Sequence, residues 1–391
     1  MTSSALMATY APPEILFEKG EGAYLFTKDG DKYLDFISGI AVTAFGHNHP
    51  HLVAALKNQA DKYWHTSNMF RIESAEKLAE RLVVNTFADH VYFGNSGAEA
   101  VEAGLKMMRR NHFDQGDEKR TRIIGMKNSF HGRTIATVAA AGNPAHTKGF
   151  FDGDLGCDHV PFGDIDALRN MISDKTAGVI LEPVQGEGGI LPAPKGYLEA
   201  VRKLCDETGI LMMLDEIQCG MGRTGKLFAY EWSSIEPDIL ASAKGLGGGF
   251  PIGACLATHK ASACMVVGTH GSTFGGNPLA TTVANAVLDL VLEDGLLDQV
   301  TERSNQLKSG LDEVAAKHPT ILGATQGLGL MLGIKCLVPN TELLAKLRDA
   351  RLLTGRAGTD ILRLLPPLNL TETHIREALD ILDSVCTEIE S

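Results

Sequence analysis

A lysine stands where a buried, apolar side chain would be expected. Lys244 ends the apolar run Asp238–Ala243 and is followed at once by the glycine-rich stretch Gly245–Gly253. A partly desolvated amine has a depressed pKa and can attack an aldehyde, and glycines let the backbone approach a bound group closely. A nucleotide loop is the alternative, but the stretch matches neither GxGxxG nor a Walker sequence, and Pro251 stands where a helix should begin. These residues therefore favour covalent chemistry at Lys244.

Two acidic residues end short apolar runs in the same way. Asp215 and Glu182 each follow a run typical of a buried strand. Parallel sheets bind ligands beyond the carboxyl ends of their strands, so we expect both carboxylates near Lys244. A buried carboxylate needs a cationic partner, and a cofactor pyridinium nitrogen would serve for Asp215. The spacing leaves open that Asp215 instead caps the next loop or pairs with Arg223.

A turn further upstream could bind an anion. The apolar stretch Val91–Gly94 leads through a short turn into a helical pattern that starts near Gly97. The first N–H groups of a helix, here those of Gly97 and Ala98, have no partner within the helix and attract a phosphate. An ordinary capping sequence, with Ser96 as N-cap and Glu99 three residues later, accounts for the same residues. The turn by itself supports both interpretations.

The central part of the chain has the pattern of a parallel sheet. Between Gly94 and about Pro278, short apolar runs alternate with helical stretches. One such stretch is Tyr197–Thr208, which has apolar residues at helical spacing and a stop signal at Gly209. Strand, helix and strand should therefore follow one another there, and we predict an α/β fold.

The two ends of the chain have a different pattern. The strand-like runs Ala23–Phe26 and Lys32–Phe36 flank a hairpin turn signal. After Pro278 a long helical pattern runs to about His318, and an amphipathic helix is predicted from His374 to Glu388. The predicted division is residues 1–50 as an N-terminal segment of a small domain, 51–280 as the large domain, and 281–391 as the C-terminal small domain.

The overall composition argues against several classes of protein. Thirty-six basic and 48 acidic side chains give a net charge of −12 without a basic stripe, which argues against a nucleic-acid partner. No apolar run approaches the roughly 20 residues of a membrane helix, and no targeting segment is visible, so we expect a cytoplasmic protein. The seven cysteines lack a CxxC pair and predict reduced thiols. His47, His49 and His51 lie in a turn without other ligands, so no metal site is expected.

Six short motifs follow one another along the chain: Asn95–Ala100, Phe130–Thr134, Glu182–Gly189, Leu214–Gly225, Ser242–Gly249 and His270–Pro278. In this order they resemble the class III pyridoxal 5′-phosphate (PLP) aminotransferases over nearly the whole chain. The resemblance implies a fold-type I PLP-dependent transferase. Such a protein has a large domain with a mostly parallel seven-stranded sheet flanked by helices, and a smaller α+β domain.

The resemblance also implies how the ring of PLP would be held. Lys244 would carry the cofactor as a Schiff base, and Asp215 would keep the ring nitrogen protonated, so these two are the expected catalytic residues. Phe130 would lie against the ring face. Gln218 would hydrogen-bond the phenolic oxygen of the ring.

The resemblance assigns the phosphate to the turn at the start of the helix. Ser96, Gly97 and Ala98 would surround it, and Thr273 would reach it from a neighbouring subunit, which implies a homodimer with shared active sites. Many relatives have Thr where this chain has Ala98. The missing hydroxyl removes one hydrogen bond worth about 1 kcal/mol, which should weaken cofactor retention without abolishing it.

The resemblance further implies a substrate with carboxylates. Arg363 would bind the α-carboxylate of glutamate or 2-oxoglutarate, and Arg133 the far carboxylate of an ω-amino substrate, because a guanidinium recognises a carboxylate with two hydrogen bonds. Glu187 would pair with Arg363 when the ω-amino substrate is bound. Ser272 is the remaining expected substrate contact. From the residues alone, each arginine could equally be a surface ion pair.

The N-terminal segment narrows the substrate within the family. Residues Leu34–Pro50 are similar to those of enzymes that act on N2-acetylornithine with 2-oxoglutarate as acceptor. Ile40 stands where enzymes for free ornithine commonly have Tyr, and an apolar group suits an acylated amine. Ornithine, succinylornithine, succinyldiaminopimelate and GABA remain alternative substrates. A PLP aminomutase or racemase would use the same lysine and aspartate, and a non-enzymatic cofactor-binding regulator is a further alternative.

Overall fold

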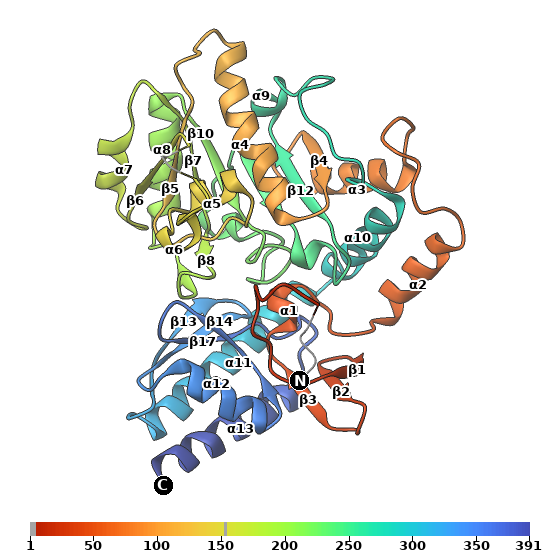
Figure 1. The fold of residues 1–391 in the computed structure, drawn as a ribbon, viewed down its shortest axis with the longest axis vertical. Helices are drawn as coiled ribbons and strands as arrows, with labels where there is room; N and C mark the ends of the chain where they lie inside the picture. Colours follow the sequence, from red (N-terminus) through yellow and green to blue (C-terminus); the bar gives the residue numbers. More distant parts are fainter. Residues whose placement is uncertain (1–4, 152–154) are drawn as a thin grey trace.

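A seven-stranded sheet is the centre of the larger part of the molecule, which a computed structural model describes over residues 5–151 and 155–391 (Figure 1). The strand order is β4-β12-β11-β10-β7-β5-β6. Strand β12 runs antiparallel to both its neighbours, whereas the pairs from β11 to β6 are parallel. The predicted mostly parallel, seven-stranded sheet is therefore confirmed. The strands are β4 (His90–Gly94), β5 (Arg122–Met126), β6 (Cys157–Val160), β7 (Thr176–Leu181), β10 (Leu211–Asp215), β11 (Ile239–Ser242) and β12 (Gly253–Ala257).

Helices bury both faces of this sheet. On β10, Leu211 and Met213 belong to the apolar cluster that includes Val101 of α4. Met212 and Leu214 point to the other face and belong to the cluster that includes residues of α8 and α10. Helix α8 confirms the prediction for residues 197–208, and Gly209 ends it with a φ of +69°. The covering helices are α3 (Glu73–Val84), α4 (Gly97–Asp114), α5 (Ile135–Ala141), α7 (Ile165–Met171), α8 (Tyr197–Thr208) and α10 (Pro278–Val291).

A second, smaller sheet and its helices make up the C-terminal part, which lies below the large sheet in Figure 1. Its strand order is β13-β14-β17-β16, and β14 pairs with β17 so that Gly333 lies opposite Arg363. Among the described residues, no helix is both long and apolar enough to cross a membrane. The elements are α11 (Leu296–Lys317), β13 (Leu322–Leu328), β14 (Met331–Cys336), α12 (Asn340–Asp349), β16 (Gly355–Ala357), β17 (Ile361–Leu364) and α13 (Glu372–Glu390).

The N-terminal segment pairs with the C-terminal part of the chain. Strands β1 (Phe17–Glu21), β2 (Tyr24–Thr27) and β3 (Lys32–Asp35) form an antiparallel meander, which confirms the predicted hairpin. Strand β15 (Leu352–Leu353) adds to it in parallel with β3. Two distant segments thus share one sheet, while the domain boundaries at residues 50 and 280 stay a prediction.

The long helical pattern predicted from Pro278 to about His318 is divided between two helices. Helix α10 ends at Val291, and α11 begins at Leu296. Gly295 precedes α11 with a φ of +86°, a left-handed conformation that breaks the helix and that glycine adopts without strain. The apolar periodicity continues across the break because both helices bury one face. The C-terminal helix is slightly longer than the predicted 374–388 and spans Glu372–Glu390.

A left-handed turn connects the N-terminal meander to the centre of the molecule. The four residues of α1 (Ser38–Ala41) have positive φ angles, with 67° at Ile40. A β-branched residue rarely adopts this conformation, so the turn stores strain. The buried carboxylate of Asp35 holds it, since Oδ1 accepts hydrogen bonds from the N–H groups of Ile37 and Ser38, each at 2.9 Å. The turn leads directly to Val42, which lines the cavity described below.

Replacing Ile40 by Asn should relieve this strain. Ile40 is 40% exposed, so little apolar contact is lost, and Asn tolerates a positive φ. We expect the free energy of unfolding in urea to stay constant or to rise by up to about 1 kcal/mol. The matched control is Ile37→Asn, because Ile37 has a negative φ and packs in an apolar cluster; it should destabilise by about 1–3 kcal/mol. A clear loss of stability for Ile40→Asn would contradict a strained turn.

Candidate active site

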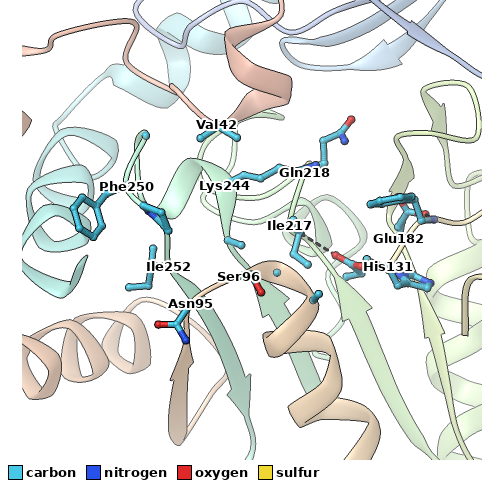
Figure 2. A pocket seen from close by; sticks show the side chains of 18 residues that line it. Val42, Asn95, Ser96, His131, Glu182, Ile217, Gln218, Lys244, Phe250 and Ile252 are labelled. Carbon is cyan, nitrogen blue, oxygen red and sulfur yellow. Dashed lines mark hydrogen bonds and ion pairs between the residues drawn. The ribbon is translucent and has the colours of Figure 1, made fainter. Parts of the chain in front are cut away.

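A cavity of about 320 Å³ lies where β7, β10 and β11 end beside the N-terminus of α4 (Figure 2). Glu182, Asp215 and Lys244 all line it, as expected from their positions at the carboxyl ends of strands. Lys244 extends beneath Val42 (Figure 2). The other predicted cofactor residues that line the cavity are Ser96, Gly97, Ala98, Phe130 and Gln218.

Lys244 provides an amine inside this cavity. It begins the short 3₁₀ turn η2 (Lys244–Leu246) with a φ of +43°, a conformation uncommon for a residue with a side chain. Burial lowers the pKa of the Lys244 amine, and the positive charge of Arg363 lowers it further, against the opposing effect of nearby carboxylates. More of the amine is therefore neutral and nucleophilic near neutral pH than for an exposed lysine.

Asp215 is held by a histidine that the sequence analysis did not single out. His131 Nδ1 lies 2.7 Å from Asp215 Oδ2, and both side chains are buried. Burial opposes protonation of His131, but the hydrogen bond and charge of Asp215 outweigh it, so the pKa of His131 is raised. Asp215 Oδ1 also accepts from the N–H of Ile217 at 3.1 Å, so the predicted loop cap is present. The signal for His131 was its place in the Phe130–Thr134 motif.

The alternative pairing of Asp215 with Arg223 is wrong. Arg223 donates instead to backbone carbonyls. Glu182 lies near the pair of Asp215 and His131, and burial raises the pKa of Glu182 to about 7. Its carboxylate accepts from the N–H groups of Phe130 at 3.2 Å and Gly186 at 3.1 Å. Glu182 therefore ties the Phe130 loop to the end of β7.

The turn before α4 is both a helix cap and an open anion site. Ser96 Oγ accepts from the N–H of Glu99 at 3.2 Å, as the capping interpretation predicted. The Glu99 side chain binds back to Asn95, which completes the turn. The N–H groups of Gly97 and Ala98 precede the first intrahelical hydrogen bond, which begins at Ala100, and both residues line the cavity. The capping interpretation is therefore confirmed, and the anion site stays a prediction that these two N–H groups favour.

Two glycines allow the close packing around this turn. A Cβ on Gly97 would lie 2.6 Å from Ile217 Cδ1, on the loop that follows Asp215. A Cβ on Gly253, the first residue of β12, would lie 2.1 Å from the carbonyl oxygen of Ser96. The first contact is with the Ile217 side chain and the second with the backbone of Ser96, so the turn packs closely against both the Asp215 loop and β12.

A second cavity of about 770 Å³ adjoins the first and shares Phe130 with it. Arg133 and Glu187 line this outer cavity, and the Arg133 guanidinium lies 5.3 Å from the centre of the Phe130 ring. Glu187 Oε1 pairs with Arg363 Nη1 at 2.5 Å, as predicted. Gln218 Oε1, on the wall of the inner cavity, lies 3.4 Å from the same Nη1. Arg363 itself lines neither cavity.

Ser272 and Thr273 do not line either cavity of this chain. Ser272 Oγ accepts from Asn95 Nδ2 at 2.9 Å and thereby supports the phosphate turn from behind. Thr273 is exposed on the surface. The substrate contact predicted for Ser272 and the phosphate contact predicted for Thr273 therefore stay predictions that depend on a second chain.

The side chains of His47 and His51, from the cluster found in the sequence, do not meet at one site. His47 Nε2 pairs with Asp35 at 2.8 Å, whereas His51 Nε2 pairs with Asp289 at 2.9 Å. Within the described ranges, no group of His, Cys, Asp or Glu has the arrangement of a metal site. All seven cysteines fall in these ranges, are buried and form no disulfide.

The sequence and the fold have close counterparts among known proteins. The sequence profile of the class III aminotransferases matches residues 6–386, and the chain belongs to this family of PLP-dependent enzymes. It is 53% identical over 380 residues to the acetylornithine aminotransferase of Mesorhizobium japonicum, covering 97% of this chain and 95% of that protein. The N-acetylornithine aminotransferase of Stenotrophomonas maltophilia has a similar structure, with a TM-score of 0.85, 37% identity and 97% of each chain covered.

A structure of the Toxoplasma gondii ornithine aminotransferase, described with partial occupancy of PLP at its active site, is also similar. It has a TM-score of 0.94 and 29% identity, and the match covers 99% of this chain and 93% of that one.

The residues of the inner cavity fit PLP. An amine, a buried carboxylate and the open N–H groups of a helix lie around one enclosed space, and they match the aldehyde, the ring nitrogen and the phosphate of the cofactor. The close contacts at Gly97 and Gly253 show that the turn is built for backbone approach. Ala98 contributes its N–H group but no hydroxyl, so the departure noted in the sequence remains at the cavity wall.

Lys244 should react with amine reagents at a lower pH than an exposed lysine. Its pKa is lowered from 10.5 by burial, so its neutral form appears earlier as the pH rises. We expect the pH at which cofactor-free protein is half-maximally acylated at Lys244 to lie below 10.5, measured by peptide mass spectrometry. Lys203, whose side chain is 78% exposed, is the internal comparison. The same or a higher midpoint at Lys244 than at Lys203 would contradict a depressed pKa.

Proposed function

We propose that this enzyme moves the δ-amino group of N2-acetylornithine to 2-oxoglutarate, giving N-acetylglutamate 5-semialdehyde and glutamate. The names of the Mesorhizobium japonicum and Stenotrophomonas maltophilia relatives support this substrate. The Toxoplasma gondii enzyme acts on ornithine by its name, at lower identity. Ile40 supports the acylated substrate, because an apolar side chain there suits an acyl group better than a free ammonium.

The ion pair between Arg363 and Glu187 is the observation that carries the proposal. The Arg363 side chain is 4% exposed, and its Nε has no partner among the described residues. Glu187 is 37% exposed and faces the outer cavity, so it can leave the pair when a substrate carboxylate replaces it. Arg133 offers a second carboxylate site on the same cavity. One pocket could thereby accept an amine with a single distant carboxylate, and then a dicarboxylic oxo acid.

The chain's own groups account for the proton transfers. When bound, PLP supplies an electron-accepting ring that stabilises negative charge at the carbon bearing the amine. Lys244 Nζ, whose pKa burial lowers, can take the proton from that carbon. Asp215, oriented by His131, favours a positive charge at a ring nitrogen placed against it. Apolar walls that include Ile217 and Ile252 limit water at the reacting atoms.

Acetylornithine should be the best amino donor among acetylornithine, ornithine, succinylornithine and GABA. We expect its kcat/KM to exceed those of ornithine and GABA by at least about tenfold, because those amines lose the acyl contact. Succinylornithine should fall closer to acetylornithine. Steady-state assays with 2-oxoglutarate test this, and Lys244→Ala, expected to lose at least about 10³-fold of activity, is the control.

Two outcomes would contradict the proposal. A preference for ornithine or GABA would assign the pocket to another ω-amino substrate. Turnover of the amine without 2-oxoglutarate would favour an aminomutase, since only a transaminase needs an acceptor to restore its cofactor.

We propose further that two copies of the chain share their active sites in the cytoplasm. Thr273 lies on a loop that contacts a second loop, since Asn68 Nδ2 donates to Ser272 O at 2.9 Å. The two loops together expose large apolar side chains, which supports burial against a second copy. These side chains and their exposed fractions are Met69 83%, Phe70 68%, Val267 105% and Phe274 59%. Seven cysteines that form no disulfide support a reducing compartment.

Chains with complementary defects should restore each other. Lys244→Ala removes the amine, and Thr273→Glu would place a negative charge against the phosphate of a neighbouring chain, so each homodimer should be inactive. Mixed dimers would contain one site that has both native residues. We expect coexpression to recover up to about one quarter of wild-type activity. The absence of recovery in verified mixed dimers, or an active Thr273→Glu protein, would contradict shared sites.

A further inference from the structure

Arg223 is a buried guanidinium without a carboxylate partner. The residue is 2% exposed, and among the described residues its Nη1 donates only to the carbonyls of Leu330, at 3.2 Å, and Pro366. Its Nη2 has no partner. Burial lowers the pKa of Arg223 to about 9. A buried charge of this kind adds little stability by itself, since well-packed apolar residues commonly serve as well. Its contacts therefore suggest a positional role.

The two carbonyls belong to a different sheet from Arg223. Arg223 lies in the loop that follows Asp215 at the carboxyl end of β10, whereas Leu330 lies in the turn between β13 and β14. Pro366 follows β17, the strand that carries Arg363. One side chain thus connects the loop of the cofactor cavity to both strands that place Arg363 in the C-terminal sheet, drawn in blue in Figure 1.

Backbone contact reinforces this connection. The N–H of Leu330 donates to the carbonyl of Arg223 at 2.9 Å. A Cβ on Gly329 would lie 2.5 Å from that carbonyl and 2.4 Å from Thr224 Cα, and Gly329 has a φ of +60°. The hairpin and the loop therefore meet so closely that only glycine fits between them.

The loop after Asp215 contacts the strands that place Arg363 at two points, through Arg223 and through Gln218. Arg363 Nη1 lies 3.4 Å from Gln218 Oε1, and Gln218 is on the same loop as Arg223. We propose that Arg223 is a positioning residue for the oxo-acid substrate: it holds the strand of Arg363 at a set distance from Gln218 and Asp215. Arg223 has this role only if Arg363 binds 2-oxoglutarate, so the inference rests on the function proposed above.

Replacing Arg223 should separate the two half-reactions. In Arg223→Met, we expect the KM for 2-oxoglutarate to rise at least about tenfold, because a misplaced guanidinium loses its paired hydrogen bonds. The half-reaction with acetylornithine, which uses Arg133, should change less than about threefold. The affinity of the PLP-loaded enzyme for glutarate, an unreactive dicarboxylate, should fall by the same factor as the 2-oxoglutarate KM rises, measured by titration of the cofactor absorbance. Arg223→Lys keeps the charge but loses the planar set of guanidinium donors, so its KM for 2-oxoglutarate should lie between those of the wild type and of Arg223→Met.

Arg202→Met is the matched control. Arg202 lies on α8, which covers the large sheet, and its side chain is 15% exposed. It pairs with Asp238, which is on neither of the two strands that place Arg363. The Arg202→Met substitution should lower the thermal unfolding temperature, while the ratio of the activities in the two half-reactions should not change. Equal losses in both half-reactions of Arg223→Met, or unchanged glutarate affinity, would overturn the inference. Should Arg223→Met fail to fold, Arg223→Lys carries the same comparison. A wild-type enzyme that does not bind glutarate or use 2-oxoglutarate would instead refute the proposed function.

Discussion

The meeting of parallel strand ends at one edge of the large sheet is the constraint on which the site depends. It brings Glu182, Asp215 and Lys244 into one enclosed cavity, although more than 60 residues separate the first from the last. Burial there acts in opposite directions on acids and bases: it raises the pKa of Glu182 and lowers that of Lys244. His131 pairs with Asp215 at 2.7 Å, and this pairing raises the pKa of the histidine against the effect of burial. The sheet edge therefore brings an amine with a lowered pKa into the same cavity as a buried histidine–aspartate pair.

The predicted phosphate side of the cavity is the turn before α4, which packs closely against two segments. The Ile217 side chain of the Asp215 loop approaches the turn at Gly97, and β12 approaches the Ser96 carbonyl at Gly253. Ser272 supports the same turn through Asn95. The N–H groups of Gly97 and Ala98 at the helix end would hold an anion there without a hydroxyl at Ala98.

The substrate side has an asymmetric ion pair. Arg363 is fixed in the interior by β17 and by its contact with Gln218, whereas its partner Glu187 is far more exposed. Of the two, the carboxylate is the one free to move, so an incoming carboxylate would displace Glu187 and leave the guanidinium in place. This arrangement requires that Arg363 is held in a fixed position. The contacts of Arg223 with the carbonyls of Leu330 and Pro366 hold the strand of Arg363 in that way.

The sequence by itself determined the order of strands and helices, the reactive residue types at the strand ends and the motif order of the family, because these depend on local periodicity and on residues close along the chain. It did not determine that His131 pairs with Asp215, that Ser272 lies behind the phosphate turn, or that Gly295 divides the long helical pattern into two helices. The pairings were settled only by the tertiary structure, since they join segments up to 177 residues apart and depend on which loops meet beyond the sheet edge. The helix division depended on packing, because both helices bury an apolar face and the periodicity conceals the break.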